Sequence, residues 1–332
     1  MFGGNIVTAV GPNQNYNPDL KWESTEQTNI GIDYGFFNGK INGSMDYYVK
    51  NTNDLLLSFN VPSPAEVTDI IANVGSVENK GFEFNINTSF VERNKFKWDA
   101  YANLSTNKNK VVSLSNESWS TEEIFTGIIP VPGFTTEHPT IIRPGEPLGS
   151  FYGYEYIGVN QDGEQQFKDI NNDGEITPGE DKTIIGNSQP DFTYGFGSTI
   201  SYGRINFGFY FTGVQGVEIF NATALDVQTI STLPGQNTLV AAFSDGIAFG
   251  EPAIYSSKWI QDASFLRLNN VSIGYNLDVS NIAWINKANV YLNAQNLFVI
   301  TGYNGYDPEV NGVDFTTYPR PRVLTLGMKL QF

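Results

Sequence analysis

The feature of this sequence that most constrains its fold is a period-two alternation of apolar and polar residues, which recurs from end to end. In 81–90, apolar Phe82, Phe84 and Ile86 alternate with polar residues, and 204–212 repeats the pattern. Such alternation predicts a β-strand with one apolar face. Further stretches of this kind bring the expected number of long strands to nine, and they lie at 28–37, 41–58, 95–108, 192–203, 263–276, 289–295 and 322–332.

The spacers between these predicted strands alternate strictly between short and long. FNGK, VERN, YGR and 276–284 are short, whereas 59–77, 109–191, 214–261 and 301–321 are long. Antiparallel strands with short turns at one end and long loops at the other are typical of an outer-membrane β-barrel. The strands reach roughly ten residues, which is enough to cross a bilayer at a tilt. We therefore expect an all-β antiparallel meander of about nine barrel strands.

A soluble β-sandwich is the alternative architecture, because it also alternates apolar and polar residues. The lengths of the strands and the alternation of loop lengths favour the barrel. In a barrel, Phe82, Phe84, Ile86, Phe207, Phe209, Phe211, Leu326, Met328 and Leu330 should share the convex, lipid-facing side, with Glu83, Asn85, Asn293, Gln295 and Lys329 facing the lumen. The alternation changes phase at Asn269–Asn270, which predicts a β-bulge.

The chain ends in VLTLGMKLQF, an alternating strand closed by an aromatic residue. Leu330 lies on its apolar face with Met328, and Gly327 lies on the opposite face. Such an ending resembles the signal by which outer-membrane barrels are recognised for insertion. We therefore assign Gly327, Leu330 and Phe332 to an assembly signal read by the barrel-assembly machinery.

Composition excludes several classes of protein. The net charge of −16 argues against a nucleic-acid partner, whose phosphates require Lys and Arg. No cysteine is present, so disulfides and thiolate metal sites are excluded. The sequence contains no run of 18 apolar residues, so no membrane-spanning helix is expected. The N-terminal residues do not have the basic and apolar regions of a signal peptide. No nucleophile elbow or phosphate-binding loop appears, and we expect no enzyme activity.

Residues 169–180, DINNDGEITPGE, match the twelve-residue calcium-loop pattern. Asp169, Asn171 and Asp173 occupy positions 1, 3 and 5, Glu175 offers a carbonyl at position 7, and Glu180 offers a bidentate carboxylate at position 12. Nothing around the motif predicts a helix, so a bound Ca²⁺ would clip a long exposed loop. The alternative is a polar turn whose acidic residues face water.

Other candidate residues carry weaker signals. His138 is the single histidine, so a His-based metal cluster or proton relay is not available. The pair Glu122–Glu123 would suit a glycosidase, but solvated loop residues are the simpler interpretation. The aromatic residues suit two different roles. Trp98, Trp259 and Trp284 are candidates for an interfacial girdle, and Trp119 and Tyr152 for stacking on sugar rings, with loop packing as the alternative.

Several segments resemble the SusC/RagA family of TonB-dependent outer-membrane transporters. They occur in order along nearly the whole chain: NPDLKWESTEQTNIGIDYGFFNGKINGSMDYYVKNTNDLLL (17–57), NVGSVENKGFEFNI (73–86), GSFYGYEYIGV (149–159), TIIGNSQPDFTYGF (183–196), LNNVSIGYNL (268–277) and NVYLNAQNLFVITGYNGYDPEV followed by PRPRVLTLGMKLQF. The resemblance implies a barrel of about 22 strands, a plug and a TonB box. No counterpart of the signal peptide, plug or TonB box is seen, so residues 1–332 are expected to be the C-terminal portion of such a barrel.

The resemblance also implies an orientation and partners. The C-terminus and the short turns would be periplasmic, and the long loops extracellular. A SusD-like lipoprotein would cover the outer face, the TonB complex would act through the plug, and outer-membrane lipids would surround the strands. The implied function is uptake of oligosaccharides or peptides. A soluble, secreted, calcium-dependent carbohydrate-binding β-protein is the alternative hypothesis.

Overall fold

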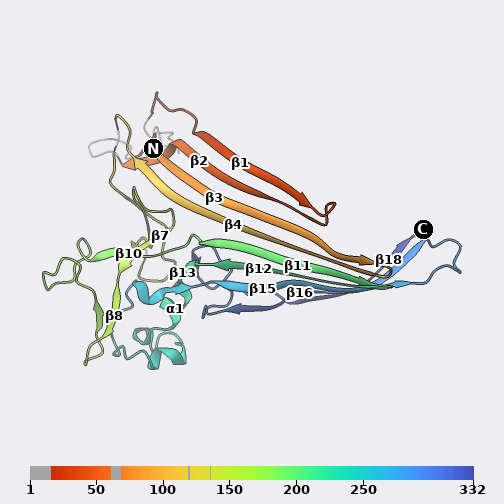
Figure 1. The fold of residues 1–332 in the computed structure, drawn as a ribbon. Helices are drawn as coiled ribbons and strands as arrows, with labels where there is room; N and C mark the ends of the chain where they lie inside the picture. Colours follow the sequence, from red (N-terminus) through yellow and green to blue (C-terminus); the bar gives the residue numbers. More distant parts are fainter. Residues whose placement is uncertain (1–15, 61–68, 119, 135) are drawn as a thin grey trace, which may run out of the picture.

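The computed structural model describes residues 16–60, 69–118, 120–134 and 136–332. Its largest element is a nine-stranded antiparallel sheet in which every strand neighbours the next long strand along the chain (Figure 1). The strands are β1 (Ser24–Phe36), β2 (Ile41–Asn60), β3 (Asp69–Arg93), β4 (Phe96–Leu114), β11 (Phe192–Tyr202), β12 (Ile205–Gln215), β15 (Phe265–Leu277), β16 (Lys287–Thr301) and β18 (Val323–Gln331). The predicted meander of nine strands is confirmed.

The long connections between these strands meet at one end of the sheet, and the short turns lie at the other (Figure 1). The turns span 37–40, 94–95, 203–204 and 278–286. The C-terminus lies at the same end as the turns. No helix among the described residues is long and apolar enough to cross a membrane.

The first long connection is shorter than the alternation indicated, because β3 begins at Asp69 rather than near Gly81. In this extension, Ala72, Asn73 and Val74 are consecutive and all buried. Both faces of the strand are covered there, so apolar and polar residues no longer alternate and the sequence reads as a loop. Further along, Val77 packs in a cluster with loop residues such as Ile124 and Leu148.

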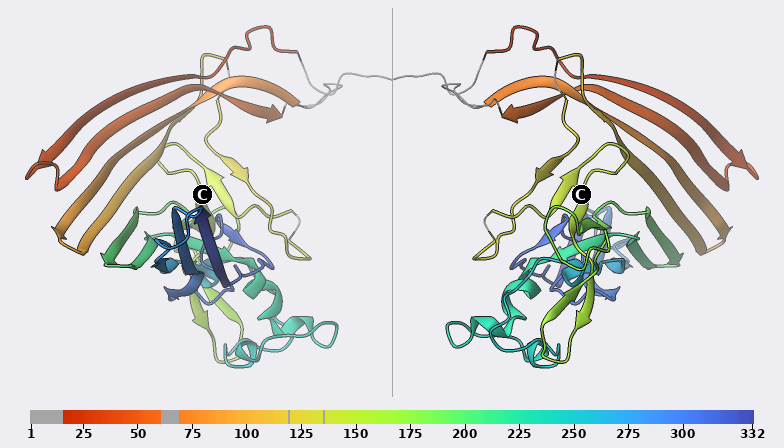
Figure 2. Two further views of the ribbon diagram at one scale, coloured as in Figure 1. Left: turned by 90° about the vertical axis from the view of Figure 1, so that its right-hand side faces the viewer. Right: turned by 90° about the vertical axis from the view of Figure 1, so that its left-hand side faces the viewer.

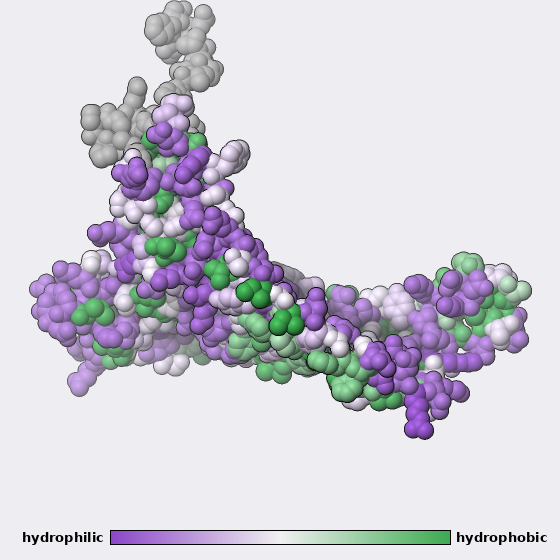
Figure 3. Space-filling view, turned by 45° about the horizontal axis from the view of Figure 1, so that its top comes forward, coloured by the Kyte–Doolittle hydropathy of each residue, from purple (hydrophilic) through white to green (hydrophobic). Residues whose placement is uncertain are grey.

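The interstrand register assigns each side chain to one face of the sheet. Phe84 pairs with Met45 and Leu104, and Phe207 pairs with Ile200 and Ile273. Following these pairs places the nine residues expected to face lipid on one face, and Glu83, Asn85, Asn293, Gln295 and Lys329 on the other. Figure 3 shows hydrophobic residues gathering along the strands, between hydrophilic surroundings.

No second sheet covers this apolar face within the described part of the chain. Phe82, Phe207, Leu326 and Met328 remain exposed, whereas the buried clusters are built largely from the long loops. The sandwich alternative requires such a face to be packed against a second sheet, and the observed sheet does not form one.

The predicted bulge is confirmed. Tyr210 pairs with Asn270 and Phe211 pairs with Leu268, so Asn269 is the extra residue on β15. Its side chain donates to the Thr212 hydroxyl at 2.6 Å. The opposite neighbour β16 skips Asn296, which adopts a positive φ of 52°. The bulge therefore keeps apolar residues on one face across the change of phase.

Tyrosines lie over glycines directly opposite them on neighbouring strands. Tyr48 faces Gly81, Tyr101 faces Gly197, and Tyr291 faces Gly327. A Cβ atom at any of these glycines would meet the facing ring. At Gly81 it would also meet the backbone carbonyl of Thr106. The absence of a side chain thus allows the rings to lie flat on the inner wall, which is the polar face of the sheet opposite the apolar face.

The long connections fold into a separate body of short elements. They form a four-stranded, a three-stranded and a two-stranded sheet. The elements are β5 (Ile124–Thr126), β6 (Thr140–Ile142), β7 (Ser150–Tyr154), β8 (Tyr156–Val159), β9 (Gln165–Phe167), β10 (Lys182–Asn187), β13 (Glu218–Asn221), α1 (Ala222–Val227), η1 (Ile230–Thr232), η2 (Val240–Phe243), η3 (Ser257–Trp259), β14 (Ile260–Asp262) and β17 (Val313–Asp314). Figure 2 shows the nine-stranded sheet curving around this loop body, which lies on its concave side.

The glycines on the inner face predict a graded series of stabilities. Gly81→Ala should destabilise the barrel most, by about 1–3 kcal/mol, because a backbone carbonyl cannot swing away from the new methyl group. Gly327→Ala should cost about 0.5–1.5 kcal/mol, because only the end of the Tyr291 ring must move. Urea unfolding of the detergent-solubilised protein measures both. Gly35→Ala is the control, since a Cβ there meets no atom within 4 Å. Equal stabilities for all three variants would contradict the series.

Candidate functional site

The loop body has its own core, assembled from separate connections. Ile129 and Phe151 come from the connection between β4 and β11, and they pack with Phe220, Tyr255 and Trp259 from the connection between β12 and β15. The Tyr255 hydroxyl donates to the Pro139 carbonyl at 2.8 Å, and burial raises its pKa well above the ordinary value. The loops are therefore held as a packed unit at one end of the barrel wall.

The core changes one assignment made from the sequence. Trp259 is not a girdle residue, because it is only 2% exposed and its indole N–H donates to the Ile254 carbonyl. In the sequence, Trp259 lies at the end of a long loop and close to a predicted strand, and this position suggested a girdle residue. Trp98 does lie on the apolar face, where its indole N–H donates to Ser198 at 2.9 Å. If lipid covers this face, the bond satisfies a donor that no water could reach.

A buried ion-pair network fixes the connection between β16 and β18 to the barrel wall. Arg267 of β15 is 2% exposed and donates to Asp307 and to the Asn296 side chain, both at 2.5 Å. Glu309 lies 3.2 Å from Arg267 and 2.9 Å from Arg320. Removing Arg267 would leave the buried Asp307 carboxylate with only the half-exposed Arg320, 4.0 Å away, and breaking a buried pair typically costs about 3–5 kcal/mol. Sequence reasoning missed this network because its members are far apart in the chain.

A cleft of about 590 Å³ opens in the loop body. Its walls come from α1, η2, β14, β17 and the segment after β16, and its polar lining includes Asn221, Thr223, Gln261, Asn304, Tyr306 and Asp314. The volume is within the range of about 300–1,000 Å³ that is usual for sites binding small molecules. It is therefore the hollow of the loop body whose size and lining best suit a ligand.

Asp314 is fully buried at the cleft wall. Its Oδ2 accepts a hydrogen bond from the Tyr303 hydroxyl at 2.7 Å, and its Oδ1 has no donor among the described residues. Burial, followed by the contact with Asp314, raises the pKa of Tyr303 above its ordinary value. Tyr303 therefore stays protonated and remains a donor to the carboxylate at any physiological pH.

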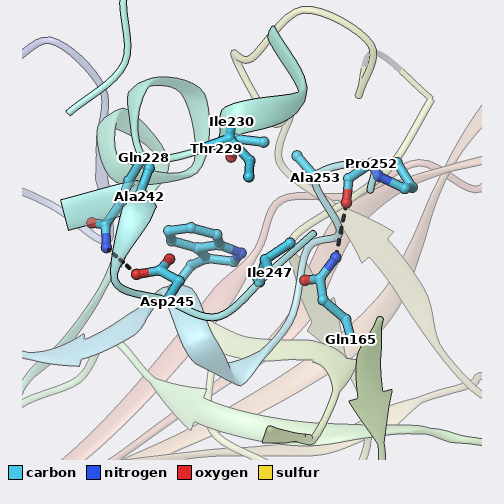
Figure 4. Close-up of a pocket in the computed structure, with 10 residues that line it drawn as sticks. Gln165, Gln228, Thr229, Ile230, Ala242, Asp245, Ile247, Pro252 and Ala253 are labelled. Carbon is cyan, nitrogen blue, oxygen red and sulfur yellow. Dashed lines mark hydrogen bonds between the residues drawn. The ribbon is translucent and has the colours of Figure 1, made fainter. Parts of the chain in front are cut away.

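A second hollow in the loop body is too small for a substrate. It holds about 10 Å³, which is the size of one water molecule. Figure 4 shows Gln165 donating to the Pro252 carbonyl and Gln228 donating to Asp245 at its wall. Trp259 also lines it. This cavity belongs to the packing of the loops rather than to a binding site.

The predicted calcium loop is an exposed turn between β9 and β10. Asn171 Nδ2 donates to Asp173 at 2.8 Å and to Glu180 at 3.0 Å, so these two carboxylates converge on one atom. Asp169 instead accepts from the backbone N–H groups of Asn172 and Gly174. No cluster of three or more Asp, Glu, His or Cys side chains able to hold a metal occurs within the described residues. Binding of Ca²⁺ requires the loop to close further, and it stays a prediction.

The loop is closed by a residue that the motif does not include. Asp181 is fully buried and accepts from the N–H groups of Ile170 and Thr177, both at 2.8 Å. These backbone hydrogen bonds lower the pKa of its carboxyl group. The sequence signal for it is a second acidic residue directly after Glu180, one position beyond the calcium pattern. The fold of this loop rests on Asp181 even without a metal ion.

The remaining candidate residues have structural partners. Glu123 forms an ion pair with Arg143. His138 Nδ1 lies 2.7 Å from the Gly127 carbonyl. Tyr152 is 9% exposed beneath Arg143, so its ring is not available for stacking on a sugar. Trp119 lies outside the described residues.

The proposed assembly-signal residues lie at the end of the sheet that carries the turns. Leu330 pairs with Ala288 on β16, and Gly327 pairs with Tyr291. The Phe332 ring stacks on Trp284 with centroids 5.6 Å apart and planes inclined by 8°. Both rings remain largely exposed. The terminal aromatic is therefore accessible, and its role in assembly stays a prediction.

Protonation of Asp181 should open the loop. Its folded pKa lies below the ordinary value, so its contribution is present at neutral pH and is lost as pH falls through that lowered pKa. Hydrogen-exchange protection of the Ile170 and Thr177 amides, corrected for intrinsic rates, should fall over this acidic range. Asp181→Asn should lower the protection already at pH 7, because one of the two N–H groups loses its acceptor. Asp162→Asn, in the same connection, should leave it unchanged; equal protection in both variants would refute the role.

Calcium binding is tested separately by Glu180→Gln, which keeps the side-chain length and removes the charge. Calorimetry of the solubilised protein should show a calcium heat in the millimolar to sub-millimolar range typical of extracellular modules, and the variant should lose it. Asp162→Asn again serves as the control. A parent protein without calcium heat, or a heat that is unchanged in Glu180→Gln, would show that the loop is a polar turn.

Comparison with known proteins identifies the family that shares this architecture. A family model described as TonB dependent receptor-like, beta-barrel matches residues 1–297. TonB-dependent receptor P3 of Formosa agariphila is 34% identical over 95% of this chain and 35% of its own length. TonB-dependent receptor SusC of Bacteroides thetaiotaomicron is 32% identical over 100% of this chain and 34% of its own length. The chain thus spans about a third of the length of these relatives.

Among solved structures, the RagAB peptide transporter superposes with a TM-score of 0.79 at 26% identity. The superposition covers 95% of this chain and 36% of that one. The RagAB peptide importer in the 'open-open' state gives a TM-score of 0.80 over 96% of this chain and 36% of that one, also at 26% identity. The meander, its loop lengths and these matches agree, and the chain belongs to the family of TonB-dependent receptor-like β-barrels.

Proposed function

We propose that this chain forms the C-terminal barrel portion of an outer-membrane importer of the SusC/RagA type. The importer takes up oligosaccharides or peptides, is driven by TonB through a plug, and works with a SusD-like lipoprotein at its extracellular face. The observation that carries this proposal is the combination of an apolar-faced meander with a folded loop body at one end. The names of the similar proteins, SusC and the RagAB peptide transporter, support it.

The apolar face of the sheet supports a membrane location. Ile30, Leu326 and Met328 are each more than half exposed, and neighbouring strands extend the surface with residues of the same kind. Covering this surface with lipid stabilises the protein by about 25 cal/mol for every Å² of apolar surface removed from water. The outer edges of β1 and β18 have no partner strand among the described residues. In lipid such edges must be paired, so further strands of a larger barrel complete the wall.

The loop body supports a protein partner. Val240, Phe243 and Phe249 are 85%, 67% and 72% exposed and lie close together in sequence, in and after η2. We call these three residues the η2 patch. Large exposed apolar side chains on the extracellular side suit a partner that covers them. A SusD-like lid, which meets the long loops from outside, is the partner that we assign to this patch.

Deletion of the gene tests the proposed function. Uptake of oligosaccharides or peptides should fall in the deletion strain and return on complementation, and the protein should fractionate with the outer membrane and require detergent. The uptake of both classes of compound should be measured with labelled mixtures of several sizes. Unchanged uptake, or a protein that stays monomeric in buffer without detergent, would refute the assignment.

The partner is tested with Phe243→Glu in the full-length protein. A charge at position 243 should reduce co-purification of a lipoprotein at least tenfold, because it would be buried at the interface. Ile157→Glu, at a similarly exposed loop residue on β8, is the matched control. A lipoprotein that is retained equally in both variants, or found with neither the parent nor the variants, would overturn the partner assignment.

A further inference from the structure

Three lysines continue the apolar face of β3 and β4 toward the long loops. Phe82 lies on this face, and two residues before it Lys80 pairs directly with Lys108 of β4. Lys110 follows two residues later on β4. Because paired residues share a face and every second residue of a strand returns to it, all three lysines lie on the same face as Phe82. We call Lys80, Lys108 and Lys110 the lysine cluster.

The cluster carries more positive charge than its neighbours neutralise. All three lysines are exposed, and only Lys80 has a carboxylate partner, since its Nζ lies 3.2 Å from Glu78. Lys108 and Lys110 form no ion pair within the described residues. Like charges directly opposite each other destabilise a strand pair, and Lys80 and Lys108 have this arrangement. The pair therefore favours an anion between its two ammonium groups.

The elements around the cluster do not supply that anion. On one side, the residues of β2 that pair with the cluster on this face are uncharged, and Glu26 lies beyond them on β1. On the other side, the turn at 143–148 runs beside β4, because the Val111 N–H donates to the Glu146 carbonyl. The Glu146 carboxylate pairs with no lysine or arginine in the described part of the chain. An external anion is left as the partner of the cluster.

The position of the cluster along β4 corresponds to the level of lipid headgroups. The stretch from Phe96 to Thr106 contains about ten residue steps of about 3.3 Å, which at a tilt of about 40° span about 25 Å. This is the usual height of the lipid-facing band of a barrel. Lys108 and Lys110 come next on the same strand, so they lie just outside the band, on the side of the long loops.

Cations are otherwise rare on this face. Among the described residues of the nine strands, the register places one further lysine or arginine on it, namely Arg93, which pairs with Phe96 at the end that carries the turns. The chain as a whole has a net charge of −16 and repels anions over a long range. The lysine cluster is therefore a local exception, concentrated on two neighbouring strands.

The chemistry of lysine and this position favour a phosphate carried by a lipid. An ammonium group binds phosphate as a point charge. Its long apolar stem can lie along the lipid-facing wall while the charge reaches the headgroups. Basic residues beside a bilayer are attracted to anionic lipids, whose headgroups they meet at this level. A phosphate between Lys80 and Lys108 replaces their mutual repulsion by two attractions.

We propose that the lysine cluster binds the phosphate group of an outer-leaflet lipid, namely the phosphorylated glycolipid lipid A. Lys80 and Lys108 hold the phosphate, Lys110 adds a third charge beside it, and the acyl chains lie against Phe82 and Tyr47, which pair on the same face. This inference goes beyond import, because it concerns the membrane around the barrel. It rests on the outer-membrane location in the proposed function.

Native mass spectrometry of the full-length protein in a non-ionic detergent tests the site, with diphosphoryl lipid A as the probe. EDTA is present so that divalent ions cannot bridge phosphate to carboxylates. Lys108→Gln should weaken binding about fivefold, and Lys80→Gln combined with Lys108→Gln should weaken it roughly tenfold or more. Lys50→Gln is the matched control and should leave binding unchanged. It removes the same charge from an exposed lysine at a similar height, but Lys50 pairs with Asn79 on the opposite face.

Two further probes identify the source of the phosphate. Dephosphorylated lipid A should bind the parent protein no better than lipid A binds the double variant, and an excess of inorganic phosphate should displace little lipid A. Equal binding of the dephosphorylated lipid would overturn the phosphate contact. Full displacement by inorganic phosphate would assign the cluster to the free ion and refute the lipid. An equal loss of binding in Lys50→Gln would show unspecific attraction between charges.

The stability of the barrel provides a readout that a merely structural role of Lys108 would not produce. In detergent without lipid A, Lys108→Gln should unfold at the same temperature as the parent protein or a higher one, because the repulsion with Lys80 is relieved. In nanodiscs containing lipid A, the variant should unfold at a lower temperature than the parent. Heat-modifiable migration on gels measures both. A variant that is less stable in both media, or less stable in neither, would contradict the proposal.

The inference and the proposed function fail separately. If the protein requires detergent and deletion of the gene abolishes uptake, but Lys108→Gln binds lipid A as tightly as the parent protein, the import function stands and the lipid site is refuted. If the protein stays monomeric in buffer without detergent, the membrane location fails, and the lipid site fails with it.

Discussion

The hydrogen-bond register between neighbouring strands is the constraint on which the rest of this structure depends. A slip of one residue would move every side chain of a strand to the other face of the sheet. The pairing of Phe84 with Met45 and Leu104, repeated strand by strand, keeps an apolar face continuous across nine strands. The bulge at Asn269 preserves that continuity where the sequence changes phase. The same register places tyrosines opposite glycines on the inner wall, so one set of backbone contacts determines both surfaces.

The number, order and faces of the strands could be predicted from the sequence because each depends on local periodicity. The prediction failed where a strand is covered on both sides. From Asp69 to Lys80 β3 stays paired with its neighbours through several register shifts, but Ala72, Asn73 and Val74 are all buried and the alternation disappears. Trp259 was misassigned for a related reason. An aromatic residue beside a predicted strand suggests an interface with lipid, and only the packing of three distant segments shows that it is a core residue.

The loop body could not be predicted from the sequence, for a different reason. Its contacts join residues that are far apart in the chain, such as Arg267 with Asp307 and Tyr255 with Pro139. Neither pair belongs to a periodic pattern or a motif. The calcium-like motif does not include the residue that closes the loop. Asp181 lies one position beyond the end of the motif and accepts the two hydrogen bonds that close it. The cleft is built in the same way, from the connections before β15 and after β16, so its lining could not be assembled from sequence alone.

The barrel wall and the loop body use apolar residues in opposite ways, and this difference links the fold to the proposed function. On the wall, apolar side chains point outward and remain exposed, so this surface is stable only if lipid covers it. In the loop body, Phe151, Phe220 and Trp259 point inward and stabilise a core without lipid. The loops can therefore hold a defined cleft in water while the strands are anchored in a membrane. Since the strands β12, β15, β16 and β18 carry the loops directly, a rigid wall fixes the position of the cleft at the mouth of the barrel. Under the proposed import function, this cleft would stand at the entrance that the protein presents to its cargo.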